Sequence, residues 1–179
     1  MTMKNIIIVA LVLLSAKTVQ AQYKPVEQGS SLKFTIKNLG FGVDGSFSGF
    51  EGIVNFDPQN AVAGSFDITI DAATVNTDNS LRDGHLKGDS FFDVKNYPKI
   101  RLLSTKVNGN KGNYQFTGQL TIKGKSKIIS FPFTARLLSS GDGYSFKGSF
   151  KMNRKDFDVG GTSTVSDELE VNINVIVKK

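Results

Sequence analysis

The sequence contains no cysteine, no tryptophan and a single histidine, His85. Without cysteine the chain can form no disulfide, no thiolate metal site and no cysteine nucleophile. The other strong metal ligands, the carboxylates, are scattered along the chain, so we expect no metal site and no cofactor. The absence of tryptophan and the presence of only 4 tyrosines argue against the aromatic belts of membrane-spanning proteins.

No apolar run is long enough to span a bilayer as a helix, and the run at Ile6 to Leu14 covers only part of that length. Lys4 precedes this run and Val19-Gln20-Ala21 follows it, an order that is typical of a secretory signal peptide. We predict that residues 1–21 are cleaved and that residues 22–179 form one domain in the periplasm or outside the cell. An N-terminal strand or a membrane anchor is the alternative.

The formal net charge is +6 at pH 7, but the lysines are spread along the chain rather than clustered. A nucleic-acid-binding surface requires a basic stripe with stacking aromatic residues. We therefore expect no nucleic-acid partner.

Apolar and polar residues alternate with period two over eight segments, as in strands that have one buried face. These segments are 32–37, 47–56, 65–73, 99–107, 114–122, 127–138, 144–152 and 169–177. Pro132 indicates an edge or a bulge in the sixth segment. Most connections are short, so neighbouring strands should pair antiparallel, and eight strands can close into a barrel. We expect an all-β, eight-stranded antiparallel β-barrel.

Three segments interrupt the alternation. We interpret residues 23–30 as a polar lead-in and residues 38–45 as a glycine-rich loop whose Phe41 and Val43 fold over the interior. The third, residues 77–98, connects the third and fourth strands and is too long for a hairpin loop, which favours a functional role. Asp78 or Asn79 can cap a short helix over Leu81–Lys87.

Several strings within the third segment and after it occur in order. They are Thr-x-Asn-x-x-Arg-Asp-x-His-Leu from Thr77, Asp-x-Phe-Phe-Asp from Asp89, Tyr-Pro-x-Ile from Tyr97, and Ser104-Thr105. Further landmarks are Phe34 to Asn38, Phe56-Asp57-Pro58, Gly118 to Gly124 and Asn153 to Phe157. Together they resemble the YceI-like family. One departure is Asp158, which stands where the family has glycine and puts the local turn in doubt.

The resemblance implies a lipocalin-like barrel that is exported and holds a long apolar chain, such as a polyisoprenoid or a fatty acyl or amide chain. It also implies that the chain can pair into a homodimer. From periodicity alone, the inward side chains form a solid core. Gly52, Gly118 and Gly148 on apolar faces leave room, however, and the resemblance favours a tunnel. The predicted lining is Phe34, Ile36, Phe50, Phe56, Phe66, Ile68, Ile100, Leu102, Phe116, Leu120, Phe131, Phe133 and Phe150.

Five polar residues are predicted to contact a ligand headgroup at the tunnel mouth: Arg82, Asp83, His85, Asn153 and Arg154. Arginine offers a fixed fork of donors and histidine can donate or accept. In this interpretation Phe91 and Phe92 pack onto the barrel while Arg82 and His85 face the mouth. The alternative is structural: ion pairs fasten residues 77–98 to the barrel, and local hydrogen bonds hold the turn at residue 153.

The predicted function is an exported lipid-binding protein that serves carriage, storage or stress protection and contacts membranes transiently. One alternative is an enzyme acting on an isoprenoid or ester, because His85, Asp83 and Ser80 or Ser90 are the residue types of a triad. No Gly-x-Ser-x-Gly string supports it, and we assign no catalytic residue. The other alternative is a small outer-membrane barrel, which also has eight alternating strands.

Overall fold

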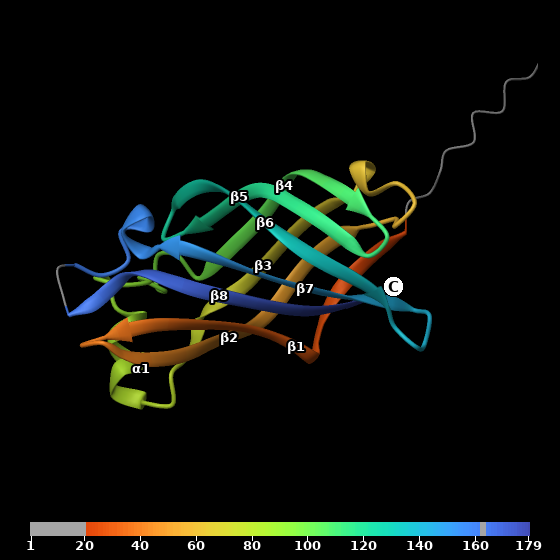
Figure 1. Ribbon diagram of the computed structural model, residues 1–179. Helices are drawn as coiled ribbons and strands as arrows, with labels where there is room; N and C mark the ends of the chain where they lie inside the picture. The colour runs from red at the N-terminus through yellow and green to blue at the C-terminus, as the bar shows by residue number, and fades with distance from the viewer. Residues whose placement is uncertain (1–20, 162–163) are drawn as a thin grey trace, which may run out of the picture.

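The computed structural model describes residues 21–161 and 164–179, and within them eight strands form a closed antiparallel barrel (Figure 1). Each strand pairs with the next and β8 pairs with β1, which confirms the predicted fold class. The strands are β1 (Gln22–Asn38), β2 (Phe41–Asn55), β3 (Ser65–Asn76), β4 (Lys99–Asn110), β5 (Asn113–Ile122), β6 (Lys125–Leu137), β7 (Gly143–Asn153) and β8 (Val165–Lys178). The predicted signal peptide lies outside the described residues, apart from Ala21.

Three short helices interrupt the strands. The predicted helix between β3 and β4 is present as α1 (Ser80–Lys87), and the side chain of Asn79, rather than Asp78, caps its N-terminus. The 3-10 helices η1 (Ala61–Ala63) and η2 (Arg154–Phe157) follow β2 and β7. None of the described helices has the length and apolar character needed to cross a membrane.

β1 is longer than predicted, because residues 23–30 belong to the strand rather than to a polar lead-in. The pairing register of β1 shifts in this region against both neighbours. Polar side chains replace the missing ladder bonds there: the Glu27 carboxylate accepts from the backbone N–H groups of Gly49 and Phe50, and the Ser30 hydroxyl accepts from the Ile176 N–H at 2.9 Å. These residues are polar because they seal the barrel wall.

The connection between β1 and β2 is a tight hairpin, not the expected irregular loop. Leu39 and Gly40 form its turn, both with positive φ (51° and 84°). The expectation that Phe41 folds over the interior is wrong, because its side chain is 78% exposed. Val43, the second residue of that expectation, is half-buried and faces the interior.

Pro132 marks the point where β6 leaves β7. The β6–β7 ladder runs from Phe133↔Gly148 to Leu137↔Tyr144, whereas on its other side Pro132 pairs in register with Gln115 of β5. Proline has no N–H to donate, so it is tolerated where one of its two sides is unpaired. The prediction of an edge position at Pro132 therefore holds for the side that faces β7.

Aromatic rings fill the end of the barrel where β2 leads into β3. Phe56, only 2% exposed, lies at their centre, and its ring makes edge-to-face contacts with Tyr114, Tyr144 and Phe146 at centroid distances of 5.1, 5.3 and 5.1 Å. Such contacts add to the stabilisation from burial. Burial in this cluster raises the pKa of the Tyr144 phenol. This end of the barrel is a packed core.

Candidate functional site

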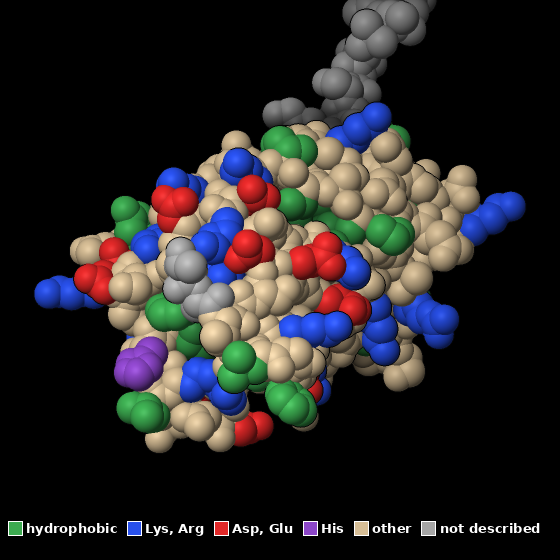
Figure 2. All heavy atoms as spheres, turned by 60° about the vertical axis from the view of Figure 1, so that its left-hand side comes forward, with side chains coloured by type: hydrophobic (Ala, Val, Ile, Leu, Met, Phe, Trp, Pro, Cys, Tyr) green, Lys and Arg blue, Asp and Glu red, His purple; other side chains and the backbone are tan. Residues whose placement is uncertain are grey.

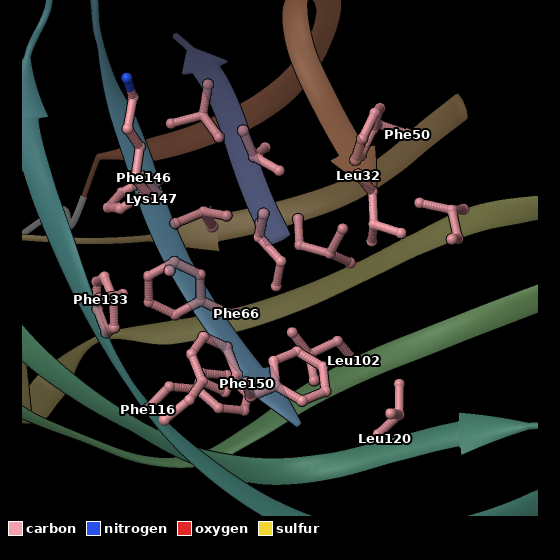
Figure 3. A pocket seen from close by; sticks show the side chains of 18 of the residues that line it. Leu32, Phe50, Phe66, Leu102, Phe116, Leu120, Phe133, Phe146, Lys147 and Phe150 are labelled. Atoms are coloured by element: carbon pink, nitrogen blue, oxygen red, sulfur yellow. The ribbon is translucent and has the colours of Figure 1, made fainter. Parts of the chain in front are cut away.

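Two apolar cavities lie end to end inside the barrel. The inner cavity has a volume of about 100 Å³ and lies next to the aromatic cluster, as Figure 3 shows, with the rings of Phe66, Phe116 and Phe133 around it. The outer cavity has a volume of about 160 Å³ and extends under α1 and the residues that follow it. Five residues line both, and we call this set the waist: Leu32, Ile70, Ile100, Leu120 and Phe150. The two cavities therefore adjoin at the waist, and we refer to them together as the tunnel.

The tunnel wall is almost entirely apolar. Among the residues that the structure describes, Lys147 is the one charged residue along the inner cavity, and the outer cavity has four polar ones: Asn38, Thr77, Arg82 and Arg154. A water molecule needs about 10–15 Å³ of space and several polar partners. These cavities are large enough for water, but their lining offers few groups that could hydrogen-bond to it. The tunnel suits a flexible hydrocarbon chain.

Twelve of the thirteen predicted lining residues lie along this tunnel. They are Phe34 and Ile36 in the outer cavity; Phe50, Phe66, Ile68, Leu102, Phe116, Phe131 and Phe133 in the inner cavity; and Ile100, Leu120 and Phe150 in the waist. The prediction for Phe56 is wrong, because that side chain is the centre of the aromatic cluster. That these residues contact a ligand stays a prediction.

Sequence reasoning missed the contribution of β8 and of Leu86 in α1. β8 lines the tunnel with Leu169, Val171, Ile173, Val175 and Val177. The period-two alternation of this segment could have identified these lining residues, because every second residue of a strand points to the same face. Leu86, Phe91 and Phe92 close over the outer cavity from the other side of the mouth.

The three glycines that were expected to leave room have different roles. Only Gly148 lines the tunnel, in the inner cavity. At Gly52 and Gly118 a β-carbon would come within 2.0 Å of the Asp67 carbonyl oxygen and 2.3 Å of the Leu103 carbonyl oxygen. These two glycines allow close approach of a neighbouring strand, so the expectation is wrong for them.

Residues 88–98 fold back over the outer cavity together with α1. The Phe92 ring packs edge-to-face on Phe47 of β2 with a centroid distance of 5.3 Å, and its N–H donates to the Leu86 carbonyl at 3.0 Å. The Gly160 N–H donates to the Ser90 carbonyl at 2.8 Å, which joins this segment to the chain that follows η2. The segment therefore covers the mouth, as the sequence predicted for Phe91 and Phe92.

Arg82 and Asp83 hold the start of this segment through Thr77. The Arg82 guanidinium donates from Nε to the Thr77 hydroxyl at 2.7 Å and from Nη2 to the Thr77 carbonyl at 2.6 Å. The Asp83 carboxylate accepts from the Thr77 N–H at 2.9 Å and from its hydroxyl at 2.6 Å. Arg82 lines the outer cavity and Asp83 does not, so Asp83 has the structural role that was the alternative.

His85 is exposed on α1 and lines neither cavity, and its predicted headgroup contact at the mouth stays a prediction. Figure 2 shows the histidine side chain, in purple, on the surface. The Asp83 carboxylate is occupied by Thr77, as described above, rather than by an imidazole. The triad types in this segment are not assembled in the described structure.

Arg154 begins η2 and is buried, with 5% of its surface exposed. Its guanidinium donates to the carbonyl oxygens of Val159 (2.8 Å), Ser166 (3.0 Å) and Val165 (3.1 Å), and it forms an ion pair with Asp167 at 2.9 Å. These bonds fasten the turn after β7 to the start of β8. Arg154 borders the outer cavity, but its donors serve the backbone.

Asn153 and Asp158 complete the turn at η2. The exposed Asn153 side chain accepts from the Lys155 N–H at 2.8 Å as an N-cap and lines neither cavity, and its predicted headgroup contact stays a prediction. Asp158 has the left-handed conformation of a glycine (φ 53°). Its carboxylate binds Lys125, and this hydrogen bond lowers its pKa. The pair therefore stabilises the fold above the ordinary carboxyl pKa and is lost as the pH falls through the lowered value.

Among the described residues, no cluster of histidine or carboxylate side chains has the arrangement of a metal site.

A family model described as the YceI-like domain matches residues 23–177. A UPF0312 protein of Pectobacterium carotovorum is 30% identical over 97% of this chain and 95% of its own length.

Solved structures that share the fold include the two described here. The crystal structure of Burkholderia cenocepacia BcnA has a TM-score of 0.76 and 29% identity, covering 82% of this chain and 95% of that one. A polyisoprenoid binding domain from Saccharophagus degradans has a TM-score of 0.71, covering 87% of this chain and 97% of that one. Because the second is only 16% identical, it supports the fold alone.

Proposed function

The chain belongs to the YceI-like family, and from this premise we propose that it is an exported protein that binds a long apolar lipid inside its barrel. A polyisoprenoid or a fatty acyl or amide chain has the required chemistry. The observation that carries the proposal is the pair of apolar cavities that adjoin at the waist, the inner one next to the aromatic cluster. The basic, apolar and small-residue order of residues 1–21 supports export to the periplasm or beyond.

The driving force is the transfer of hydrocarbon out of water. Each buried methylene contributes about 0.8 kcal/mol, so one five-carbon isoprene unit contributes about 3 kcal/mol before the costs of association. Selectivity should follow chain length and width, because the wall offers few polar groups. Such binding suits carriage, storage or protection of the lipid and needs no catalytic group.

Two observations disfavour the alternatives. Against an enzyme, His85 is exposed on α1 and lies outside the tunnel lining. Against an outer-membrane barrel, the apolar faces of the strands point inward: along β5, for example, Tyr114, Phe116 and Leu120 are buried while Gln115 and Gln119 are exposed. Membrane-spanning barrels have the reverse arrangement.

Native mass spectrometry of the protein purified from its own host tests the proposal. We expect an added mass that organic extraction removes and that fragments as an isoprenoid or acyl chain. After extraction, the protein should take up a radiolabelled polyprenol or fatty acid with 1:1 stoichiometry. A protein that carries no lipid and takes up neither probe would contradict the proposal.

Two of the predicted headgroup residues, Arg82 and Arg154, line the outer cavity, and the Arg82 guanidinium has N–H donors beyond the two bonded to Thr77. Replacing it (Arg82→Met) should weaken retention of a fatty acid or polyprenyl phosphate about tenfold more than retention of the matching hydrocarbon, since a charge-assisted hydrogen bond contributes about 1.5–3 kcal/mol. Comparing the two ligands on the same variant cancels any loss of stability. Equal losses for both would assign Arg82 a purely structural role with Thr77.

A further inference from the structure

Three hairpins of the barrel have turns with the same backbone conformation. Leu39-Gly40, Lys111-Gly112 and Lys123-Gly124 each have positive φ at both residues, with values of 51° and 84°, 51° and 87°, and 50° and 72°. Lysine occupies the first position in two of them, so the backbone of this turn does not require leucine. The turn between β1 and β2 nevertheless has Leu39, which is 70% exposed, and is followed by Phe41, which is 78% exposed.

A third exposed apolar side chain lies at the same end of the barrel. Leu81 of α1 is 72% exposed, and Figure 1 shows α1 and the β1–β2 turn together at the left-hand end. In Figure 2, which brings that end forward, apolar side chains in green reach the surface near the histidine. We call Leu39, Phe41 and Leu81 the mouth anchors. Single exposed apolar residues are ordinary, but these three gather around one opening.

The mouth anchors stand on the elements that form the tunnel mouth. In the β1–β2 hairpin, Asn38 and Val43 line the outer cavity on either side of the turn, and in α1 Leu86 lines it. The turn is held in place, because the Leu39 N–H donates to the Thr164 carbonyl at 3.2 Å and the Thr164 hydroxyl donates to the Asn38 side chain at 2.7 Å. The exposed apolar groups thus stand on the same elements as residues that line the outer cavity.

We propose that the mouth end docks on a lipid bilayer, with the mouth anchors inserted at the interface. This proposal rests on the proposed function. If the tunnel binds a long apolar lipid, docking of the mouth on a bilayer lets the lipid enter without crossing water. A bilayer fits better than a protein partner, since the long apolar lipid that the tunnel suits is itself held in bilayers, and the anchors stand on two separate elements at the mouth, the β1–β2 hairpin and α1. Three side chains give weak, reversible attachment, which suits delivery or uptake of a ligand.

The turn comparison supplies the test variant. Leu39→Lys gives the β1–β2 turn the same Lys-Gly sequence as the other two turns, so the backbone of the turn should be undisturbed. Phe41→Lys removes the second anchor. The matched control is Val62→Lys with Leu137→Lys, which changes two exposed residues (72% and 61%) in the η1 region and at the end of β6, away from the mouth. Flotation of the mature chain with phosphatidylcholine vesicles, with and without phosphatidylglycerol, measures docking.

We expect the control to bind vesicles like the wild type and the Leu39→Lys/Phe41→Lys variant to bind at least tenfold less, on both vesicle types and in high salt. Uptake of a radiolabelled fatty acid from detergent should be unchanged in both variants. A wild type that binds neither vesicle, or anchor and control variants that bind equally, would overturn the proposal. Loss of detergent uptake together with docking would also overturn it, because the turn would then belong to the ligand site. Failure of uptake in the wild type would instead contradict the proposed function.

Discussion

Leu120→Trp should reduce the affinity for a long-chain lipid about 100-fold. Leu120 lies at the waist, where it lines both cavities, and an indole at this position fills the passage between them. A ligand confined to the outer cavity loses at least one isoprene unit of burial, about 3 kcal/mol, and each 1.4 kcal/mol corresponds to a factor of ten. Titration of delipidated protein with a fluorescent polyprenol or fatty acid measures this change.

Leu137→Trp is the matched control, because it introduces the same side chain at a position that is 61% exposed on the outside of the barrel. It should leave the affinity unchanged. Overpacking of the waist costs about 1–3 kcal/mol of stability, so chemical unfolding of both variants must show that they remain folded at the assay temperature. Full affinity in a folded Leu120→Trp variant would place the lipid outside the tunnel.

The same variant should also change selectivity. A chain short enough to fit the outer cavity alone never reaches the waist, so its affinity should change little. The ratio of the affinities for long and short chains therefore falls in Leu120→Trp. Binding driven only by a headgroup at the mouth would leave that ratio constant. The measurement thus separates burial along the tunnel from recognition at its opening.

The strand pattern predicted the barrel because period two and short turns leave few other topologies. It could not predict depth along the barrel axis. Phe50 of β2 and Phe56, the residue after that strand, belong to the same period-two pattern in the sequence, yet Phe50 lines the inner cavity and Phe56 lies in the aromatic cluster. Only the register between strands, which depends on the bulges near Glu27 and Gly49, sets that depth. The sequence alone therefore could not predict which part of the interior is tunnel and which part is packed core.

The polar residues at the mouth were harder to predict for a different reason. The sequence places Arg82, Asp83 and His85 within one helical turn, but it does not say which face of that helix is covered. Asp83 and Arg82 turn toward Thr77, while His85 faces solvent. A charged residue in a loop of this kind has many carbonyl and hydroxyl partners nearby, and local partners of this type usually satisfy it.

Arg154 is the strongest example of a charged residue satisfied by local backbone partners. Arg154→Met should lower the free energy of unfolding by about 3–5 kcal/mol. The substitution retains much of the apolar stem but leaves the carbonyl oxygens of Val159, Val165 and Ser166 without the donor that they now have. Removing one partner of a buried hydrogen-bond network lowers the free energy of unfolding by more than the hydrogen bonds themselves contribute to it. The reason is that the remaining polar groups stay buried without a partner. Urea unfolding followed by circular dichroism measures the loss.

Arg136 is exposed, so the matched control Arg136→Met should lower the free energy of unfolding by less than about 0.5 kcal/mol. Val159, one of the carbonyl partners of Arg154, also lines the outer cavity. A loosened turn at η2 should therefore release bound lipid faster in Arg154→Met than in Arg136→Met. If Arg154→Met kept full stability and lost only ligands with a polar head, Arg154 would be a headgroup contact, as the sequence first suggested, and its bonds to the backbone would be incidental.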